Sequence, residues 1–471
     1  MESLKRGIKQ STGQRVRNIT ANFVTFLNRV RFINSLFGKL FAQIELTKKL
    51  RIMKRSLLFL SALIIAGSFT SCKKYDNKEV YANVPVYMDY DAFRTSFYYE
   101  AEAVPVEHPG NIYIHNQYIF VVDEDKGIHI LDNHDKTNPY FLGFMNIPGA
   151  TQVSVDGTTL YANSFIDLVT IDISNINDPK MINRDEDVFT YSTPISNDEY
   201  PIADIYKDRG VVVDWNIEMT KDVSGFGAKW FVSDCEECEQ TEMQTKSSAS
   251  VRVNLAGSRS KMAIINNHLY VLDQDELKSF NISNQTDPVF AQSQNTWSDP
   301  ETLFPDGEFL YVGTTTGMKI FDAGANPERP NETGEVEHVE SCDPVVVQGD
   351  YAYVTLRSGS ECGGVENELQ VIDVSKKWWP KLKRQYDMSD PHGLAVEGDL
   401  LFICDGNSGL KVYDNSDPLD CGDNLLYNFP AIQTSDLILN NGTAIMIAEE
   451  GVYQYDYTNP SNLHMISLLY F

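Results

Sequence analysis

Residues that could do chemistry occur along this chain of 471 residues without the spacing of a familiar catalytic motif. The sequence has no GxSxG nucleophile elbow, HExxH zinc motif, P-loop or Rossmann glycine run. The segment VDEDKG, residues 122–127, has alternating acids but lacks the closing Glu of an EF-hand. Cys235 and Cys238, in CEEC, have the spacing of a redox or metal pair. Since no second pair accompanies them, zinc is weakly supported, and we expect a local disulfide between them.

Cys72 stands behind an apolar run, Leu57–Gly67, that itself follows Lys54 and Arg55. This is the layout of a secretory signal, here residues 53–71, and the run is shorter than the roughly 20 residues that span a bilayer. The sequence FTSC, residues 69–72, resembles the lipobox of Gram-negative lipoproteins, although Leu is commoner than Phe at its first position. The resemblance implies lipidation of Cys72 and anchoring of its acyl chains in the outer membrane, facing the periplasm or the exterior. The alternative is a buried apolar strand with an incidental cysteine.

Residues 1–52 precede this signal and carry eleven Lys or Arg against Glu2 and Glu45. They fit either a basic amphipathic helix that binds membrane surfaces or an upstream extension from a mis-called start codon. A signal peptide works only at the N-terminus, so we favour Met53 as the start.

The rest of the chain is strongly acidic. Residues 1–71 hold 13 of the 39 Lys and Arg and 2 of the 66 Asp and Glu, which leaves 26 basic and 64 acidic residues, a net charge of −38, for residues 72–471. Such a surface repels nucleic-acid phosphates and anionic lipid, so we expect neither as a partner of the body of the protein. Solubility explains the charge equally well.

One phrase occurs seven times: an alternating strand that ends in Asp or Asn, then a polar turn closed by Pro. The strand-ending residues are Asp132, Asp172, Asn281, Asp322, Asp373, Asp414 and Asp456, with spacings of 40, 109, 41, 51, 41 and 42. A hairpin with Gly or Asn at its turn precedes nearly every phrase, and an apolar segment follows each. Four short strands per unit of about 41 residues predict an all-β fold, a β-propeller of four-stranded antiparallel blades. A hairpin at residues 201–216 fills the long gap, so we favour eight blades, with seven as the alternative.

The phrase GLKVYDNSDP, residues 409–418, and the hairpin GDYAYV, residues 349–354, resemble the LVIVD repeat of propeller-like bacterial and archaeal envelope proteins. With the lipobox, they suggest a Bacteroidetes-like envelope lipoprotein. The resemblance covers about residues 105–471, with residues 72–104 as a tether and first strand and an insertion at about 217–250. It implies an architecture and no particular activity.

A binding site is expected where the inner strands begin, because these starts ring the upper mouth of a propeller channel. Polar residues at these starts are Asn111, Thr151, Lys261, Glu301, Asp343, His392 and Asp436. The insertion after Trp215 and the loop at residues 357–367 are expected on the same top face, where long loops usually bind ligands. If Glu301 and Asp343 lie near His392, their charge should raise its pKa. A propeller mouth is also polar simply because it is wet.

The remaining cysteines can be sorted by the same geometry. Cys342 should enter an inner strand and Cys362 should lie in the top loop of that blade, so a disulfide is natural. Cys404 and Cys421 should lie about 9–10 Å apart, beyond disulfide reach. Cys404 is simply a small core residue.

On the opposite face, SKKWWPKLKR, residues 375–384, places five basic residues around Trp378 and Trp379. This segment could dock an anionic partner or lie at a membrane interface, or the tryptophans could merely fill the turn.

Together these features favour a monomeric binding module for a glycan, peptide or envelope protein, with no cofactor and no catalytic residue. Calcium is possible but not indicated. One alternative is a metal-dependent hydrolase or oxidoreductase with its site at the channel mouth, and another is a structural scaffold of an envelope complex.

Overall fold

A computed structural model describes residues 79–223, 254–337, 344–358 and 367–471. The predicted signal peptide and the lipidation site Cys72 lie outside the described residues. The same holds for Cys235, Cys238, Cys342, Cys362 and Asp343. Within the described ranges, no helix is long and apolar enough to cross a membrane.

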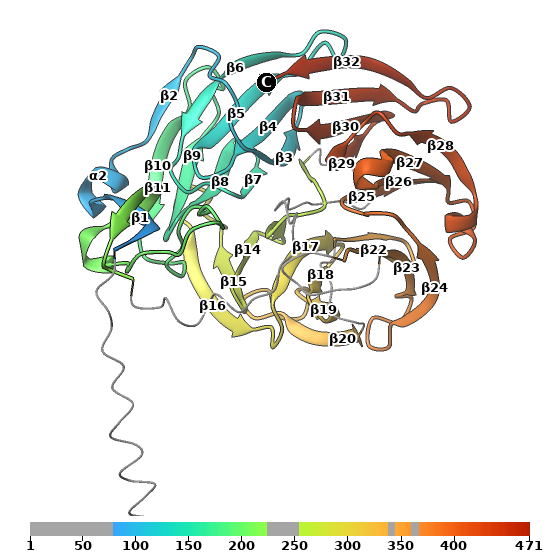
Figure 1. Ribbon diagram of the computed structural model, residues 1–471. Helices are drawn as coiled ribbons and strands as arrows, with labels where there is room; N and C mark the ends of the chain where they lie inside the picture. Colours follow the sequence, from blue (N-terminus) through green and yellow to red (C-terminus); the bar gives the residue numbers. More distant parts are fainter. Residues whose placement is uncertain (1–78, 224–253, 338–343, 359–366) are drawn as a thin grey trace, which may run out of the picture. The chain divides into compact units, whose positions relative to one another are not determined.

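Seven antiparallel blades make up most of the described chain (Figure 1). Blades 1 and 2 comprise β3 (Pro109–His115), β4 (Tyr118–Asp123), β5 (Gly127–Asp132) and β6 (Tyr140–Asn146), then β7 (Val153–Asp156), β8 (Thr159–Ser164), β9 (Asp167–Asp172) and β10 (Lys180–Asp185). Blades 3 and 4 comprise β13 (Met262–Ile265), β14 (His268–Asp273), β15 (Glu276–Asn281) and β16 (Val289–Asn295), then β17 (Pro300–Asp306), β18 (Phe309–Thr314), β19 (Gly317–Asp322) and β20 (Asn331–Glu337). Blades 5 and 6 comprise β21 (Val345–Gln348), β22 (Tyr351–Leu356), β23 (Glu368–Asp373) and β24 (Lys381–Asp387), then β25 (Leu394–Glu397), β26 (Leu400–Cys404), β27 (Leu410–Asp414) and β28 (Leu425–Phe429). Blade 7 comprises β29 (Thr434–Asn440), β30 (Thr443–Ala448), β31 (Gly451–Asp456) and β32 (His464–Tyr470).

The inner strands close a ring. Each inner strand contacts that of the next blade in the order β3, β7, β13, β17, β21, β25 and β29, and β29 returns to β3. The inner strands begin at one face, called the top here, and the turns that join third to fourth strands lie at the bottom. The propeller of four-stranded blades is therefore confirmed with seven blades, the alternative count, and the favoured count of eight is wrong.

The eighth hairpin does not exist because its strand has another partner. Residues Val211–Thr220 form β11, which pairs with β1 (Val80–Met88) in a separate two-stranded sheet. A short 3-10 helix, Lys207–Arg209, precedes β11, and Gly210 supplies the left-handed backbone (φ 121°) between them. The alternating apolar pattern thus marks a strand, with Gly210 just before it, but this strand is not part of a blade.

The segment before the first blade packs on the propeller. After β1, the short helix α2 (Tyr90–Arg94) is capped by Asp89, whose carboxylate accepts a hydrogen bond from the N–H of Ala92. Phe93 of this helix is buried. The chain then adds β2 (Tyr98–Glu100) to the outer strand β6 of blade 1. Residues 79–104 are thus a folded part of the domain.

The repeated Asp or Asn closes the turn at the bottom of each blade. The carboxylate of Asp132 accepts a hydrogen bond from the N–H of His134 at 2.8 Å, and Asp414 accepts one from Ser416 at 2.9 Å. The tight hairpins between first and second strands use left-handed residues, as predicted, including Gly157 (φ 61°). Turn chemistry therefore explains why the phrase repeats.

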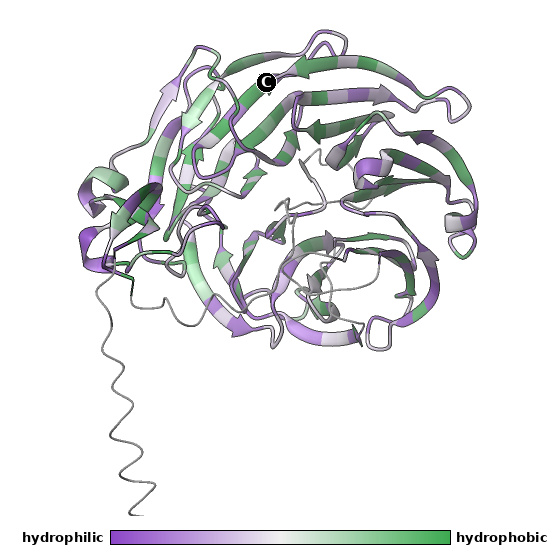
Figure 2. Cartoon of the chain, in the orientation of Figure 1, coloured by the Kyte–Doolittle hydropathy of each residue, from purple (hydrophilic) through white to green (hydrophobic). Residues whose placement is uncertain are grey.

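The third residue of the second strand is a tyrosine that contacts the next blade in blades 2 and 3. The hydroxyl of Tyr161 donates to the Gln285 carbonyl of the next blade at 2.8 Å, and Tyr270 donates to Pro327 at 2.7 Å. Figure 2 shows the apolar colouring concentrated on inner and middle strands, with more hydrophilic outer strands such as β20 and β24. Cys404 is a free, fully buried core residue, as expected.

Candidate functional site at the top of the ring

The predicted mouth residues that the structure describes all stand at the starts of inner strands, and several join neighbouring blades. The amide of Asn111 donates to the Thr151 carbonyl at 2.8 Å, and the N–H of Lys261 donates to Gln152 at 2.8 Å. Sequence reasoning placed these positions, but it did not foresee their bonds to one another. Their role in binding a ligand stays a prediction.

The chain itself occupies the centre of the ring. Strand β12 (Asn254–Ala256) pairs with the free edge of the inner strand β3 and contacts the inner strands β7 and β29. The backbone continues with the N–H of Gly257 bonded to the Ile112 carbonyl at 3.3 Å. Ser258, Arg259 and Ser260 are then 2%, 5% and 2% exposed. We call residues 254–260 the central segment, because they lie inside the ring of inner strands.

Asp436 holds this central segment in place. It is 1% exposed, and both of its carboxylate oxygens lie 3.1 Å from the N–H of Ser258. The Ser258 hydroxyl donates to Asp436 at 3.0 Å and accepts from the N–H of Leu394 at 3.2 Å. Burial raises the pKa of Asp436 well above its usual range, although the N–H of Leu437, Arg259 and Ser258 oppose the shift. Asp436 therefore ties the central segment to blade 7, while Ser258 bridges to blade 6.

His392 forms the core of a polar cluster beside the central segment. Nη1 of Arg357 lies 3.1 Å from its Nδ1, and a carboxylate oxygen of Asp390 lies 3.2 Å from its Nε2. The side chain of His392 is 10% exposed and that of Asp390 is 40% exposed. We call Arg357, Asp390 and His392 the mouth cluster.

The expected rise in the pKa of His392 is wrong. Burial lowers the pKa below 6.5, and the cations Arg357 and Arg259 lower it further against the opposing effect of Asp390. The charged groups that shift the pKa of His392 are thus two arginines and one aspartate. The sequence analysis did not place either arginine beside His392. Arg357 follows the second strand of blade 5, and Arg259 belongs to the central segment.

Lys261 and Glu301 are half-buried at the starts of blades 3 and 4. The expectation that the insertion leaves the top of a blade is wrong, because β11 belongs to no blade. The chain after the insertion returns instead as β12 inside the ring. Among the described residues, no group of three or more His, Cys, Asp or Glu has the arrangement of a metal site.

A second set of polar residues was missed by the sequence analysis. Among the described residues, four blades carry an aspartate in the hairpin between their second and third strands, with a basic side chain against it. The pairs are Asp123 with His129, Asp167 with Arg184, Asp273 with Lys278 and Asp405 with Lys411. Each aspartate also accepts hydrogen bonds from backbone N–H groups of a connecting segment, namely residues 107–108, 187, 190 and 389–390.

These carboxylates anchor the top connections of the ring. Burial by itself would raise the pKa of Asp123, but bonds from His129 and from the backbone of Glu107 and His108 leave it lowered. A sequence signal existed for three of the four pairs. An acid ends or follows the second strand, and a basic residue stands three positions before the repeated Asp or Asn.

The match to a known repeat follows the blades. The LVIVD repeat is matched at residues 108–146, 149–185, 256–296, 341–388 and 390–420. The chain carries LVIVD repeats. The matched stretches correspond to blades 1, 2, 3, 5 and 6, so the propeller has two further blades, 4 and 7, outside them.

Other comparisons add little to the description of this propeller. No curated protein sequence matches it. It is similar to the computationally designed Ika8 protein (11% identity, 77% of this chain and 88% of that chain, TM-score 0.45). It is also similar to BamB from Moraxella catarrhalis (8%, 75% and 85%, 0.44) and to a putative 6-phosphogluconolactonase from Bacteroides fragilis (11%, 64% and 79%, 0.42). Similarities this low say nothing about function.

Proposed function

We propose that this chain is a lipid-anchored interaction module of the bacterial outer membrane. The top of its ring binds a glycan, a peptide or another envelope protein. The observation that carries the binding role is the mouth cluster of Arg357, Asp390 and His392, which lies beside the central segment. A chain segment inside the ring supports recognition at the top face over passage or enclosure of a substrate.

The charges of the mouth cluster suggest the chemistry of the partner. The positive charges of Arg357 and Arg259 both lower the pKa of His392, so two cationic groups lie near this imidazole. A carboxylate or other anionic group of a glycan or peptide suits this arrangement, since guanidinium groups bind such oxygens well.

Binding at the top face should depend on pH through His392. Its lowered pKa keeps the imidazole neutral at pH 7 and charged only as the pH falls below 6.5. An anionic glycan or peptide selected from an array should therefore bind the wild type more tightly at acidic pH. The His392→Ala variant should bind without this dependence, and Glu301→Ala should retain it. If His392→Ala and Arg357→Ala both bind with wild-type affinity at every pH, the mouth cluster is not the site.

The lipid anchor is tested separately at Cys72. Labelled fatty acid should enter the wild-type chain, and the protein should fractionate with the outer membrane. The Cys72→Ser variant should take up no label and leave the membrane fraction, whereas Cys404→Ser, a change in the propeller core, should still be labelled. Undiminished labelling of Cys72→Ser would contradict the anchor and leave the top-face proposal standing.

A further inference from the structure

The turn at the bottom of blade 5 exposes two adjacent tryptophans. Trp378 is 69% exposed and Trp379 is 58% exposed. Leu382, at the start of β24, is 39% exposed. The Lys381 ammonium lies 3.4 Å from the centre of the Trp379 ring, and Lys376 is exposed beside them. We call these five residues the blade 5 patch.

The other blades show that the turn itself needs no tryptophan. The two residues before the closing Pro are polar in the other six blades: Thr137 and Asn138, Asn177 and Asp178, Thr286 and Asp287, Glu328 and Arg329, Ser416 and Asp417, Thr458 and Asn459. The backbone bond is shared, since the N–H of Trp379 donates to Lys376 at 2.8 Å and that of Asp178 donates to Asn175 at 2.9 Å. Trp378 and Trp379 therefore occupy exposed turn positions at which polar residues serve the fold equally well.

The scaffold beneath the patch is firmly fixed. Asp373 accepts bonds from Ser375 and pairs with Lys383 at 2.9 Å, and these contacts lower its pKa to about 2. The ammonium of Lys377 lies 5.3 Å from the ring centre of Tyr311 in blade 4. The patch is thus presented on a rigid turn, so little conformational freedom is lost when it meets a partner.

The charge of the segment that carries this patch indicates the chemistry of its partner. Residues 375–384 contain five basic and no acidic residues, in a chain that carries a net charge of −38 from residue 72 onward. Not every charge is available: Lys383 is paired with Asp373, and Arg384 donates to the Leu419 carbonyl at 2.9 Å. Lys376 and Lys381 remain at the exposed edge, beside two indoles. Indoles flanked by lysines are the side chains that settle at the headgroup level of a bilayer.

We propose that the blade 5 patch docks onto an anionic lipid surface, with both indoles among the headgroups and with Lys376 and Lys381 against the lipid phosphates. The two adjacent indoles and Leu382 are exposed apolar side chains, which a bilayer interface accommodates. This surface lies on the face opposite the mouth cluster, so docking leaves the top of the ring directed away from the lipid.

Tryptophan fluorescence tests the docking in the full-length chain. Vesicles of phosphatidylglycerol and phosphatidylcholine with brominated acyl chains should quench part of the emission, and pure phosphatidylcholine vesicles should not. The quenched component should disappear in Trp378→Phe/Trp379→Phe and persist in Trp297→Phe, which removes a tryptophan that is 83% exposed at the top of the ring. This local readout is independent of any binding by the N-terminal residues.

Lysine variants give the size of the effect. Lys376→Gln and Lys381→Gln should each raise the lipid concentration for half-maximal quenching about fivefold, since a basic residue at an anionic surface contributes about 1 kcal/mol. Lys180→Gln, at the equivalent position of blade 2, should change nothing. Equal quenching by pure phosphatidylcholine, or quenching that survives the loss of both indoles, would overturn the proposal. So would retention on an anionic polysaccharide without quenching by any vesicle.

Discussion

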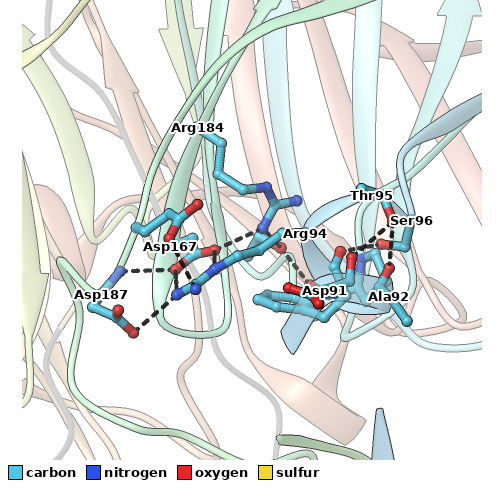
Figure 3. A network of polar contacts seen from close by, with 12 residues as sticks. Asp91, Ala92, Arg94, Thr95, Ser96, Asp167, Arg184 and Asp187 are labelled. Carbon is cyan, nitrogen blue, oxygen red and sulfur yellow. Dashed lines mark hydrogen bonds and ion pairs between the residues drawn. The ribbon is translucent and has the colours of Figure 1, made fainter. Parts of the chain in front are cut away.

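Replacing Asp167 with alanine should lower the free energy of unfolding by about 3–5 kcal/mol, because it removes the partner of a buried cation. The Asp167 side chain is fully buried and lies in the polar network drawn in Figure 3. It pairs with Arg184 at 3.0 Å and with Arg94 at 3.2 Å, and it accepts a hydrogen bond from the N–H of Asp187 at 2.8 Å. Arg184 is only 7% exposed, so without Asp167 its charge would stay buried and unbalanced. Chemical denaturation of the two proteins measures the loss.

The same network offers its own controls. Glu186 also pairs with Arg94 at 2.9 Å, but its side chain is 55% exposed, so Glu186→Gln should change stability little. Asp167→Leu combined with Arg184→Met removes both charges and should recover much of the loss. If Asp167→Ala is no less stable than Glu186→Gln, the network does not fasten α2 to blade 2.

The repeated phrase shows how much of the fold could be predicted from the sequence. Turn residues such as Asp132 and Gly157 act locally, within a few positions, so they predict strands, hairpins and the blade phrase correctly. Blade number depends on which strand pairs with which. The strand at Val211–Thr220 has the right alternation for a blade, yet its partner is Val80–Met88, more than a hundred positions away. Local pattern cannot identify so distant a partner.

The candidate site was predictable in position and not in chemistry. Aligning the hairpins placed His392 and Asp436 at the mouth, because the position of each residue follows from the repeat pattern of its own blade. Their neighbours Arg259 and Ser258 arrive with the central segment, which lies more than a hundred positions away in the sequence, so the pattern within one blade does not show the contact. The neighbours decide the electrostatics: the pKa of His392 is lowered by burial and arginines, where nearby acids were expected to raise it.

Gly393 should be the position at which one added side chain does most damage to the centre of the ring. A Cβ atom there would lie 2.6 Å from a carboxylate oxygen of Asp436 and 2.7 Å from the hydroxyl of Ser258. Gly393→Val should therefore force these two groups apart. Overpacking costs about 1–3 kcal/mol. Leaving a buried polar group without its hydrogen bonds adds about 1–3 kcal/mol, and we expect a total loss of about 3 kcal/mol or more.

A double-mutant cycle shows whether the damage runs through the central segment. Ser258→Gly removes one of the two atoms that a new Cβ would meet, so Gly393→Ala should cost less in the Ser258→Gly background than in the wild type. Denaturation of the four proteins gives the coupling. If the two changes are additive, Ser258 does not sit against Gly393. A positive coupling would place Ser258 against Gly393, where blade 6 meets Asp436 of blade 7.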